Sequence, residues 1–419
     1  MLEFWDKILE EMEGGKGVDV IYTDFSKAFD KCETGVLLRK LKAFGVSGKV
    51  GCWLAAFLDS SVRKQAVGVD GVLSALAAVI SGMPQGTVLG PYLFLIQLAD
   101  IDTSLSEGTE ASSFADDTRV RRGIASEEDC AELQKDLQGL YDWADTVGMV
   151  FNSEKFELLR FWADDDKKPD FVYTGPNGNP IEEKSSLRDL GVRISSDLSF
   201  SEQIEKVAKE GEQMASWVLR TFRGRGKILM LTVLRSLIQS RLDYCSQLWS
   251  PRDQSSINRI ESVQRHFLSK MRCAEVDGLN YWENLEHLKV YLQERRRERY
   301  QICLLWKASQ GLTEGVPVKF HWSDRRGRYA VPAAIPRNAP TKVKKARERM
   351  INVHGTKLFN ILPKSLRNED SGDFLLFKNH LDIFLSQIPD QPTVAGLGRA
   401  AQTNSLIDQV PLATDIVLD

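Results

Sequence analysis

The most informative stretch of the chain is Ser113-Phe-Ala-Asp-Asp-Thr118, where a short apolar run ends in two adjacent carboxylates. A strand that buries Phe114 and Ala115 would end here and lift the aspartates Asp116 and Asp117 into a hairpin turn. Two neighbouring ionised carboxylates raise each other's pKa, so the pair is unfavourable unless a cation binds it. Mg²⁺ suits such a pair because it prefers hard oxygen ligands. Adjacent aspartates are also common in surface turns, so this stretch alone leaves both interpretations open.

A second carboxylate lies in Val18-Asp-Val-Ile-Tyr-Thr-Asp-Phe-Ser-Lys-Ala-Phe-Asp30. The run from Val20 to Phe25 consists mainly of β-branched and aromatic residues, which predicts a buried strand. Side chains alternate along a strand, so Asp24 shares a face with Tyr22 and lies where the strand ends. The sequence therefore predicts two strand ends that each present an aspartate.

A third stretch, Ser81-Gly-Met-Pro-Gln-Gly-Thr-Val-Leu-Gly-Pro-Tyr-Leu-Phe-Leu-Ile96, predicts a loop that opens an apolar helix, with Pro91 tolerated in the first turns. With FSKAFD, SGMPQGTVLGPYLF and FADD in this order and spacing, the chain resembles the reverse transcriptase of a non-LTR (LINE-type, jockey-like) retrotransposon. The resemblance implies an α+β fold: a reverse-transcriptase palm, built as an antiparallel sheet backed by helices, followed by a helical thumb and a mostly helical C-terminal region.

Four segments follow from this resemblance and from local composition. We expect a palm with partial fingers over residues 1–200, a thumb-like helical domain over 201–275, and a mostly helical C-terminal region over 276–389. Residues 390–419 have the composition of a disordered tail.

Local patterns predict the elements within these segments. Apolar spacing predicts helices, and a turn dipeptide, Asp70-Gly71, predicts a hairpin around it. The predicted helices cover residues 2–12, 37–44, 53–58, 127–147, 202–222, 227–248, 255–271 and 282–310, the hairpin covers 62–78, and residues 164–186 form a polar hairpin or loop insertion.

The composition is that of an ordinary globular protein, with 419 residues, 42% hydrophobic content, 27% charged content and a net charge of −3. The charge is unevenly distributed, because residues 213–272 are strongly basic and residues 100–145 strongly acidic. This asymmetry suits a polyanion held near a metal site, although a solvated helical face explains many such runs. The six cysteines are scattered without metal-ligand spacing, which predicts reduced thiols in an intracellular protein. No apolar run predicts a membrane span, and no targeting signal is evident.

The resemblance implies a polymerase that uses two metal ions, expected to be Mg²⁺, with Mn²⁺ as an alternative. Asp24 and Asp116 are the predicted metal ligands because each lies where an apolar strand stops. Asp117 should point elsewhere on an extended backbone, and it joins the catalytic and metal set through the resemblance. Asp30 is interpreted as structural.

The resemblance also assigns a nucleotide-binding set: Phe25, Phe29, Gln85 and Gly86. Phe29 lies five residues after Asp24, where the family has an aromatic ring that excludes a 2′-hydroxyl. Without the surrounding motif, a core aromatic would be the simpler interpretation of this residue. Gln85 is expected to contact the incoming nucleotide or the template base.

Two later motifs complete the expected site. Met149-Val-Phe-Asn-Ser-Glu-Lys-Phe-Glu-Leu-Leu-Arg-Phe161 resembles the next palm motif, which makes Lys155 a candidate proton donor to pyrophosphate; a surface lysine is the alternative. Leu187-Arg-Asp-Leu-Gly-Val-Arg-Ile194 resembles the primer grip, with Leu190 and Gly191 near the primer end.

The partners implied are an RNA template, a DNA primer and deoxyribonucleoside triphosphates, in the cytoplasm and nucleus, with no membrane. The family normally has a long fingers region, and only 23 residues precede Asp24 here; no endonuclease domain or zinc knuckle is evident. Three hypotheses therefore stay open. The chain is either an active polymerase, or a catalytically weak or inactive remnant that binds nucleic acid, or a structural protein without a nucleic-acid role.

Overall fold

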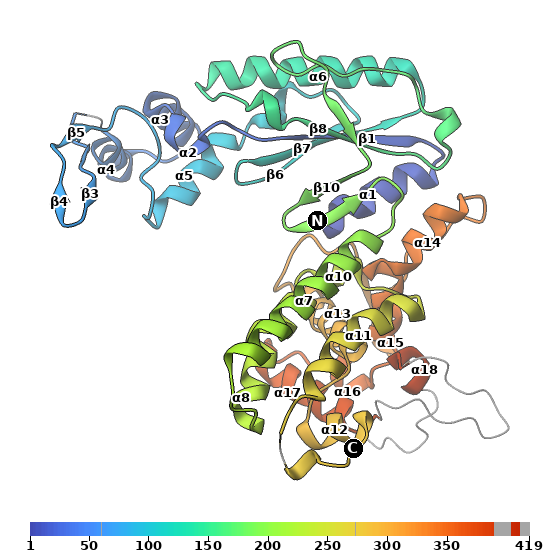
Figure 1. Cartoon of the computed structure of the whole chain (residues 1–419). Coiled ribbons are helices and arrows are strands. Elements are labelled where there is room, and N and C mark those ends of the chain that lie inside the picture. Colours follow the sequence, from blue (N-terminus) through green and yellow to red (C-terminus); the bar gives the residue numbers. More distant parts are fainter. Residues whose placement is uncertain (60, 273, 389–403, 411–419) are drawn as a thin grey trace. The chain divides into compact units, whose positions relative to one another are not determined.

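β1 (Gly17–Thr23) is the central strand of a five-stranded sheet in the computed structural model, and all but one of its residues are buried (Figure 1). It pairs antiparallel with β7 (Asp117–Ile124) on one side and with β8 (Glu157–Phe161) on the other. The predicted strand over residues 20–25 is therefore confirmed, although it begins earlier and ends at Thr23. Burial on both faces explains why β-branched and aromatic residues dominate it.

The two outer strands are β6 (Thr109–Phe114), antiparallel to β7, and β9 (Glu182–Lys184), parallel to β8. The polar segment 164–186 was expected to be a hairpin or loop insertion, and its last residues instead extend the sheet. The sheet is thus mixed rather than purely antiparallel. The α+β class is as predicted.

α6 (Glu127–Thr146) lies along one face of the sheet (Figure 1). It begins with a capping box, in which the Ser126 side chain and the Asp129 side chain each bind the other residue's backbone N–H. Its apolar face joins the main core of this part of the chain, which includes Ile21, Val120, Leu133, Leu137 and Leu140. This packing holds β1 and β7 in register at the strand ends that carry the aspartates.

Further short elements surround the sheet. The predicted hairpin over residues 62–78 is present, and both turn residues, Asp70 and Gly71, have positive φ. The remaining elements here are α2 (Ala28–Lys31), α3 (Thr34–Ala43), α4 (Gly48–Leu58), β2 (Lys64–Gln65), β3 (Gly68–Val69), β4 (Val72–Leu73), β5 (Ala77–Ala78), α5 (Leu89–Leu98), η1 (Ile101–Ser104), η2 (Ser153–Lys155) and η3 (Asp165–Lys167).

The structure describes residues 1–59, 61–272, 274–388 and 404–410, and it divides into two compact units. Residues 14–187 form the first, here called the sheet unit. Residues 1–13 and 188–419 form the second, here called the helical unit. The predicted boundaries near residues 200 and 275 differ from this division, because the chain leaves the sheet unit within β10 (Ser186–Asp189) and the thumb-like segment shares one unit with the C-terminal region.

α1 (Leu2–Glu13) belongs to the helical unit although it precedes β1 in the sequence. The reason is a buried ion-pair network around Arg347, whose Nε donates to Glu13 Oε1 at 2.7 Å and whose Nη1 contacts Asp6. The Asn352 amide also donates to Asp6 Oδ1, at 2.5 Å. A buried guanidinium needs such partners, so these contacts hold the first helix against the C-terminal residues.

The helical unit differs from the predicted helix pattern at two places. The predicted helix over 227–248 is interrupted by a π-helical segment, η4, and by Cys245 at φ 52°. The predicted helix over 282–310 is two helices, because Lys289 adopts a left-handed conformation. The elements of this unit are β10, β11 (Val192–Ser195), α7 (Ser201–Thr221), α8 (Lys227–Val233), η4 (Leu234–Gln239), α9 (Ser240–Asp243), α10 (Ser246–Trp249), α11 (Gln254–Leu268), η5 (Ala274–Val276), α12 (Tyr281–Leu288), α13 (Gln293–Ser309), β12 (Lys319–Ser323), β13 (Gly327–Val331), α14 (Thr341–Arg349), η6 (Ile351–Gly355), α15 (Thr356–Asn360), α16 (Lys364–Arg367), α17 (Phe374–Ser386) and α18 (Leu406–Gln409).

Most of the predicted tail, residues 390–419, lies outside the described residues. The exception is residues 404–410, which differ from the predicted disorder because they include α18, with Leu406 fully buried. The described cysteines are all thiols rather than disulfides. In the part of the chain that the structure describes, none of the helices combines the length and apolar character that a membrane crossing requires.

Candidate active site

Asp24 directly follows the last residue of β1, as the sequence predicted, and its side chain is only 14% exposed. Thr23 pairs with Thr118, so the next residues toward the same end of the sheet are Asp24 on β1 and Asp117 on β7. The Asp24 carbonyl oxygen accepts a hydrogen bond from the Asn152 N–H at 2.8 Å. This bond fixes the backbone at the point where the carboxylate leaves the sheet.

The turn between β6 and β7 consists of Ala115 and Asp116, because Phe114 pairs with Asp117. Ala115 has a φ of 53°, a left-handed conformation that is unfavourable for a residue with a Cβ. Such strained residues concentrate at functional sites, and Asp116, which follows Ala115 in the turn, is partly exposed.

Two details of this turn differ from the sequence prediction. Phe114 was expected to be buried and is 63% exposed, because it is the last residue of a strand at the edge of the sheet. Asp117 was expected in the turn and is the first residue of β7. The aspartates are therefore placed by the pairing of β6 with β7 rather than by burial of the ring.

The three aspartates form one electrostatic cluster, although they come from two separate stretches of sequence. The pKa of Asp117 is raised, first by partial burial and then by the negative charges of Asp116 and Asp24. Lys155 and Arg119 act in the opposite direction. An elevated carboxyl pKa in an acidic cluster indicates a site that binds cations.

Lys155 provides the cation nearest to this cluster, although its side chain is 60% exposed. Its Nζ forms an ion pair with Asp24 Oδ2. The pKa of Lys155 is raised, mainly by this hydrogen bond and by the charge of Asp24, with smaller contributions from Asp116 and Asp117. The structure thus brings Lys155 together with all three predicted metal ligands.

The chemistry of these donors fits Mg²⁺, which takes a few carboxylate oxygens and completes its shell with water and phosphate oxygens. The arrangement is not that of a fully formed protein cage: among the described residues, no three Asp, Glu, His or Cys side chains converge to hold one ion. Asp24 is engaged by Lys155 instead. A divalent ion at Asp24 would therefore compete with this ammonium group.

Asp30 has a clearer role than the sequence indicated. Its carboxylate Oδ1 accepts a hydrogen bond from the Gln85 side-chain amide at 2.9 Å, and its carbonyl oxygen accepts one from the Ser81 hydroxyl at 2.9 Å. Gly82 also lies against this backbone, where a Cβ atom would approach the Asp30 Cα and carbonyl oxygen to 2.9 Å. Asp30 thus orients the loop that carries Gln85. In the sequence, the sign of this role was its position as the last residue of FSKAFD.

The other residues of the predicted nucleotide-binding set fall into two groups. Phe29 is partly exposed and stacks on the buried ring of Phe94, with ring centroids 4.3 Å apart. Gln85 and Gly86 are exposed, and Gly86 has a φ of 73°. Phe25, by contrast, is 3% exposed and stacks on Phe151 in the core, so its ring does not face a ligand, and the expectation for that side chain is corrected.

Leu190 and Gly191 form the turn between β10 and β11, with φ values of 44° and 87°. Two residues with positive φ form the tight hairpin turn expected of a short loop. The Leu190 carbonyl accepts a hydrogen bond from the Tyr244 hydroxyl at 2.9 Å, and the Gly191 carbonyl accepts one from Lys206. A Cβ at Gly191 would approach the Tyr244 ring to 3.2 Å, so this turn needs glycine for space as well as for conformation.

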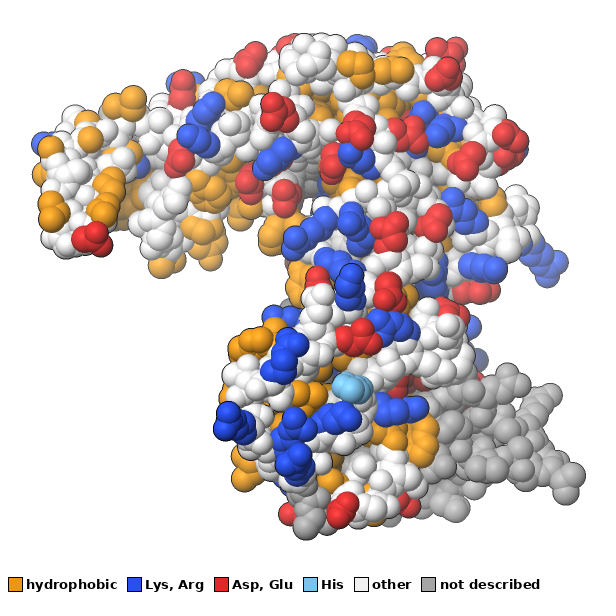
Figure 2. All heavy atoms as spheres, viewed as in Figure 1, with side chains coloured by type: hydrophobic (Ala, Val, Ile, Leu, Met, Phe, Trp, Pro, Cys, Tyr) orange, Lys and Arg blue, Asp and Glu red, His pale blue; other side chains and the backbone are white. Residues whose placement is uncertain are grey.

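The basic segment 213–272 is partly neutralised within the helical unit. Arg259 is held by Glu205 and Glu212, which raise its pKa. Other basic side chains of the segment are exposed, among them Arg220, Arg223 and Arg272. Figure 2 shows Lys and Arg side chains gathered on the visible face of this unit.

Comparison with known proteins shows what the part of the chain that carries this site is similar to. Residues 9–194 match the family model described as reverse transcriptase (RNA-dependent DNA polymerase). The chain is 25% identical over 275 residues to the RNA-directed DNA polymerase from mobile element jockey of Drosophila melanogaster, an alignment that covers 63% of this chain and 29% of that protein. It is 26% identical over 269 residues to the probable RNA-directed DNA polymerase from transposon X-element of the same species, covering 62% of this chain and 29% of that one.

A solved structure, an apo telomerase from Candida tropicalis, aligns with a TM-score of 0.34 and 12% identity over 46% of this chain and 38% of that one. The residues that match the reverse transcriptase family model include Asp24, Asp116, Asp117 and Lys155. The relatives of this chain include RNA-directed DNA polymerases from the mobile element jockey of two Drosophila species and from transposon X-element. The chain spans less than a third of the length of those relatives.

Proposed function

We propose that this chain is an RNA-directed DNA polymerase that extends a DNA primer on an RNA template with deoxyribonucleoside triphosphates. The observation that supports this most strongly is the meeting of Asp24 with the Asp116–Asp117 pair at the ends of paired strands, with Lys155 beside them. The family resemblance makes these aspartates the expected metal ligands. Surface turns do not bring carboxylates from distant stretches into one charge cluster.

Asp24, Asp116 and Asp117 would hold two divalent ions, expected to be Mg²⁺, which activate the primer 3′-hydroxyl and stabilise the departing pyrophosphate. The chain's own contribution is positioning. The β1–β7 pairing brings the strand ends at Asp24 and Asp117 together, and the turn at Ala115 carries Asp116. Positioning and charge stabilisation account for most of the rate in phosphoryl transfer.

Lys155 has two roles in this proposal. Before metal binds, its ammonium group neutralises Asp24 and so reduces the repulsion within the acidic cluster. Its long, mobile side chain would donate a proton to the departing pyrophosphate when it is not paired with Asp24. The high exposure of the side chain suits this second role.

Phe29 and Gln85 would contact the incoming nucleotide. The stacking of Phe29 on Phe94 fixes the ring, so that its exposed edge can exclude a 2′-hydroxyl from the sugar site. Gln85 is held by Asp30 and not by a flexible loop alone, which restricts where its amide can point. Exposed Gly86 leaves room beside it for a nucleotide or a template base.

The primer and template would be held by the helical unit. The fixed turn at Leu190 and Gly191 offers backbone groups to the primer end, and the exposed basic side chains of residues 213–272 offer charge to the phosphates. The similarity to polymerases favours this function over the alternative of a remnant that only binds nucleic acid.

Primer extension on an RNA template tests the proposal. The chain should extend a DNA primer in the presence of Mg²⁺ and all four deoxyribonucleoside triphosphates, and chelation of the metal should stop extension. Asp116→Ala should be inactive and folded, whereas Asp170→Ala, which removes an exposed aspartate of the sheet unit, should behave as wild type. Extension by Asp116→Ala at the wild-type rate would contradict the assignment.

A further inference from the structure

A basic pocket of about 460 Å³ lies in the helical unit, apart from every residue assigned above to catalysis. Five cationic side chains line it: Arg235, Lys289, Arg296, Arg299 and Lys378. They come from four parts of the chain. Arg235 lies on η4, and Lys289 lies in the turn before α13. Arg296 and Arg299 lie on α13, and Lys378 lies on α17. A pocket of this volume holds a ligand of small-molecule size, such as one nucleotide, and excludes a duplex.

The charge of the pocket is only partly compensated. Arg299 binds both carboxylate oxygens of Asp382, at 2.5 and 2.7 Å, and Arg296 binds Asp243 at 2.5 Å. Arg235, Lys289 and Lys378 have no carboxylate oxygen within 4.0 Å in the described parts of the chain. Three uncompensated cations around one pocket repel one another unless an anion lies between them.

Local backbone structure directs these side chains to the same place. Arg296 and Arg299 are three residues apart on α13, so they lie on one face of that helix. Arg235 lies on the π-helical segment η4, a helix type that is rare and that is often found at functional sites. Lys289 is placed by its left-handed backbone conformation, at φ 52°. Arg235 and Lys289 therefore both lie where the backbone departs from a regular α-helix.

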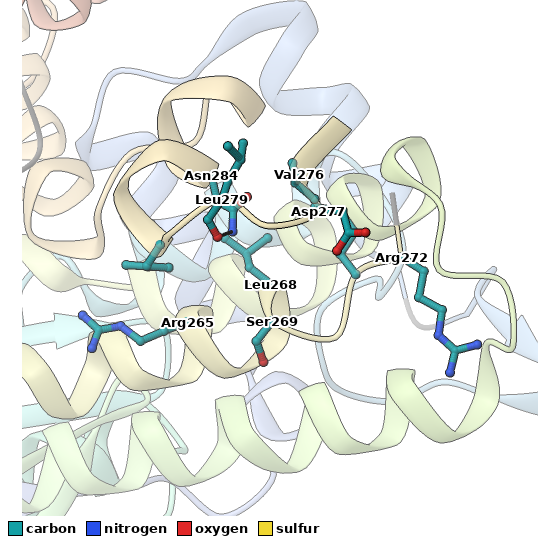
Figure 3. Close-up of a pocket in the computed structure, with 10 residues that line it drawn as sticks. Arg265, Leu268, Ser269, Arg272, Val276, Asp277, Leu279 and Asn284 are labelled. Atoms are coloured by element: carbon teal, nitrogen blue, oxygen red, sulfur yellow. Dashed lines mark hydrogen bonds between the residues drawn. The ribbon is translucent and has the colours of Figure 1, made fainter. Parts of the chain in front are cut away.

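A second pocket of the same unit shows the contrast. Its two arginines, Arg265 and Arg272, lie at opposite ends with their guanidinium groups pointing away from each other, and Asp277 lies between them (Figure 3). Arg265 also packs over the Tyr281 ring, with its Cζ atom 4.7 Å from the ring centroid. The two arginines of the second pocket thus diverge, whereas five cationic side chains line the first.

We infer that the first pocket binds a phosphate group of single-stranded nucleic acid, with about one nucleotide inside it. Guanidinium groups match phosphate geometry and lysines add unspecific charge, so the combination favours a phosphodiester over a carboxylate. The choice of a nucleic acid strand as the source of the phosphate rests on the proposed function. The pocket itself requires no catalysis, so this inference survives if the chain proves unable to polymerise.

The test measures binding of a fluorescent single-stranded RNA oligonucleotide to the full chain over a range of salt concentrations, without divalent ions or nucleotides. The double variant Arg235→Gln/Lys378→Gln should weaken binding about tenfold or more. It should also reduce the slope of log affinity against log salt by about 1.4, because each phosphate contact on a single strand contributes about 0.7. The assay contains neither divalent ions nor nucleotides, so its result does not depend on polymerisation and is separate from the polymerase proposal.

The matched control is Arg325→Gln/Lys345→Gln, which removes one arginine and one lysine that are exposed in the same unit and lie outside the pocket. Its affinity should change less than about twofold, since surface charges beyond about 10 Å are screened by salt. Equal losses in the two double variants would overturn the inference, because binding would then follow net charge. Displacement of the strand by inorganic phosphate as readily as by unlabelled strand would overturn the assignment to nucleic acid.

Discussion

The two aspartates of β1 show how one strand serves both stability and chemistry. Asp19, inside the strand, is 0% exposed and accepts hydrogen bonds from Arg160 Nε at 3.1 Å, from Trp162 Nε1 at 3.1 Å and from the Tyr173 hydroxyl at 2.8 Å. Asp24, at the end of the strand, is 14% exposed, and its carboxylate has Lys155 as its cationic neighbour beside two further aspartates. The first carboxylate is bound by the protein itself, and the second is arranged to bind something else.

The two environments shift the pKa values of neighbouring groups in ways that fit this contrast. Burial, followed by the charge of Asp19, raises the pKa of Tyr173 and so keeps this phenol a hydrogen-bond donor. Burial acts to lower the pKa of Arg160, but the charge and hydrogen bond of Asp19 outweigh it and raise that pKa. At the other end, partial burial and then the negative charges of Asp116 and Asp24 raise the pKa of Asp117. Satisfied polar groups indicate structure, and repelling like charges indicate a ligand site.

The largest expected effect is on the rate of extension by Asp24→Asn. Loss of this carboxylate should reduce Mg²⁺-dependent extension by about a thousandfold, which corresponds to about 4 kcal/mol of transition-state stabilisation. The free energy of unfolding should stay near the wild-type value. Single-turnover extension and urea unfolding measure both, and a large loss of stability in this variant would erase the contrast with Asp19.

For Asp19→Ala, we expect a loss of stability rather than a loss of extension rate. Removing one partner of a buried ion pair leaves Arg160 uncompensated and should lower the free energy of unfolding by about 3–5 kcal/mol. Asp170→Ala, at an exposed position of the same unit, should change it by less than about 0.5 kcal/mol. Urea denaturation of both variants is the measurement. A loss below about 1 kcal/mol for Asp19→Ala would mean that the buried network does not anchor the strand.

Lys155→Gln tests the carboxylate cluster at Asp24, because it separates the two roles proposed for Lys155. Without the competing ammonium group, the Mg²⁺ concentration that gives half-maximal extension should fall. At saturating Mg²⁺, kcat should fall by about a hundredfold if Lys155 donates the proton to pyrophosphate. Lys167→Gln, at a lysine that is 77% exposed in the same unit, should change neither quantity. An unchanged kcat would limit Lys155 to the role of counter-ion.

Phe29→Val tests the sugar site next to Asp24. Removing the ring should raise kcat/KM for ribonucleotides relative to deoxyribonucleotides by about tenfold, since small steric differences in a pocket are worth about 1–3 kcal/mol. The Phe94→Leu variant, which removes the supporting ring and leaves Phe29 in place, should give a smaller change. An unchanged ratio in Phe29→Val would return this residue to the core.

The smallest expected effect is a change in the free energy of unfolding of Asp117→Asn, measured without metal ions. The pKa of Asp117 is raised in the folded state, so the ionised carboxylate lowers the free energy of unfolding. This loss of stability is complete above the folded-state pKa and absent below the unfolded-state pKa. The variant should therefore be slightly more stable than wild type near pH 7, by a few tenths of a kcal/mol because solvent screens an exposed group. The difference should vanish in acid. Thermal unfolding from pH 7 down to pH 3 checks the sign, which would be reversed if the carboxylate were stabilising.

The parts of the fold that follow from local sequence were predictable. β1 and the placement of Asp24 at its end depend on a run of apolar residues, and α6 depends on apolar spacing behind a capping residue. The structural role of Asp19 was not predicted, because its donors come from β8 and from the segment around Tyr173, far away in the sequence. An aspartate inside an apolar run was the only sign of that network.

Other differences have equally local causes. Phe114 is apolar, but exposure at the edge of a sheet depends on which strands pair, and composition does not reveal this. The separation of α12 from α13 occurs at Lys289, a residue type that ordinarily continues a helix, so no glycine or proline marks the break. The contact between Asp30 and Gln85 joins the helix α2 to a loop 55 residues later and requires the folded chain. The candidate site was thus predictable in its aspartates and not in the residues that orient its loops.

The most direct test of the central claim is a Mn²⁺ titration followed by electron paramagnetic resonance, which counts unbound ion and needs no enzymatic activity. The wild-type chain should bind Mn²⁺, Asp24→Asn and Asp116→Asn should lose most of this binding, and Asp170→Asn should keep it. Far-ultraviolet circular dichroism of each variant should match the wild type, so that any loss reflects the carboxylate alone. Equal Mn²⁺ binding by the wild type and by folded Asp24→Asn would contradict the claim that the aspartates at the end of β1 bind cations.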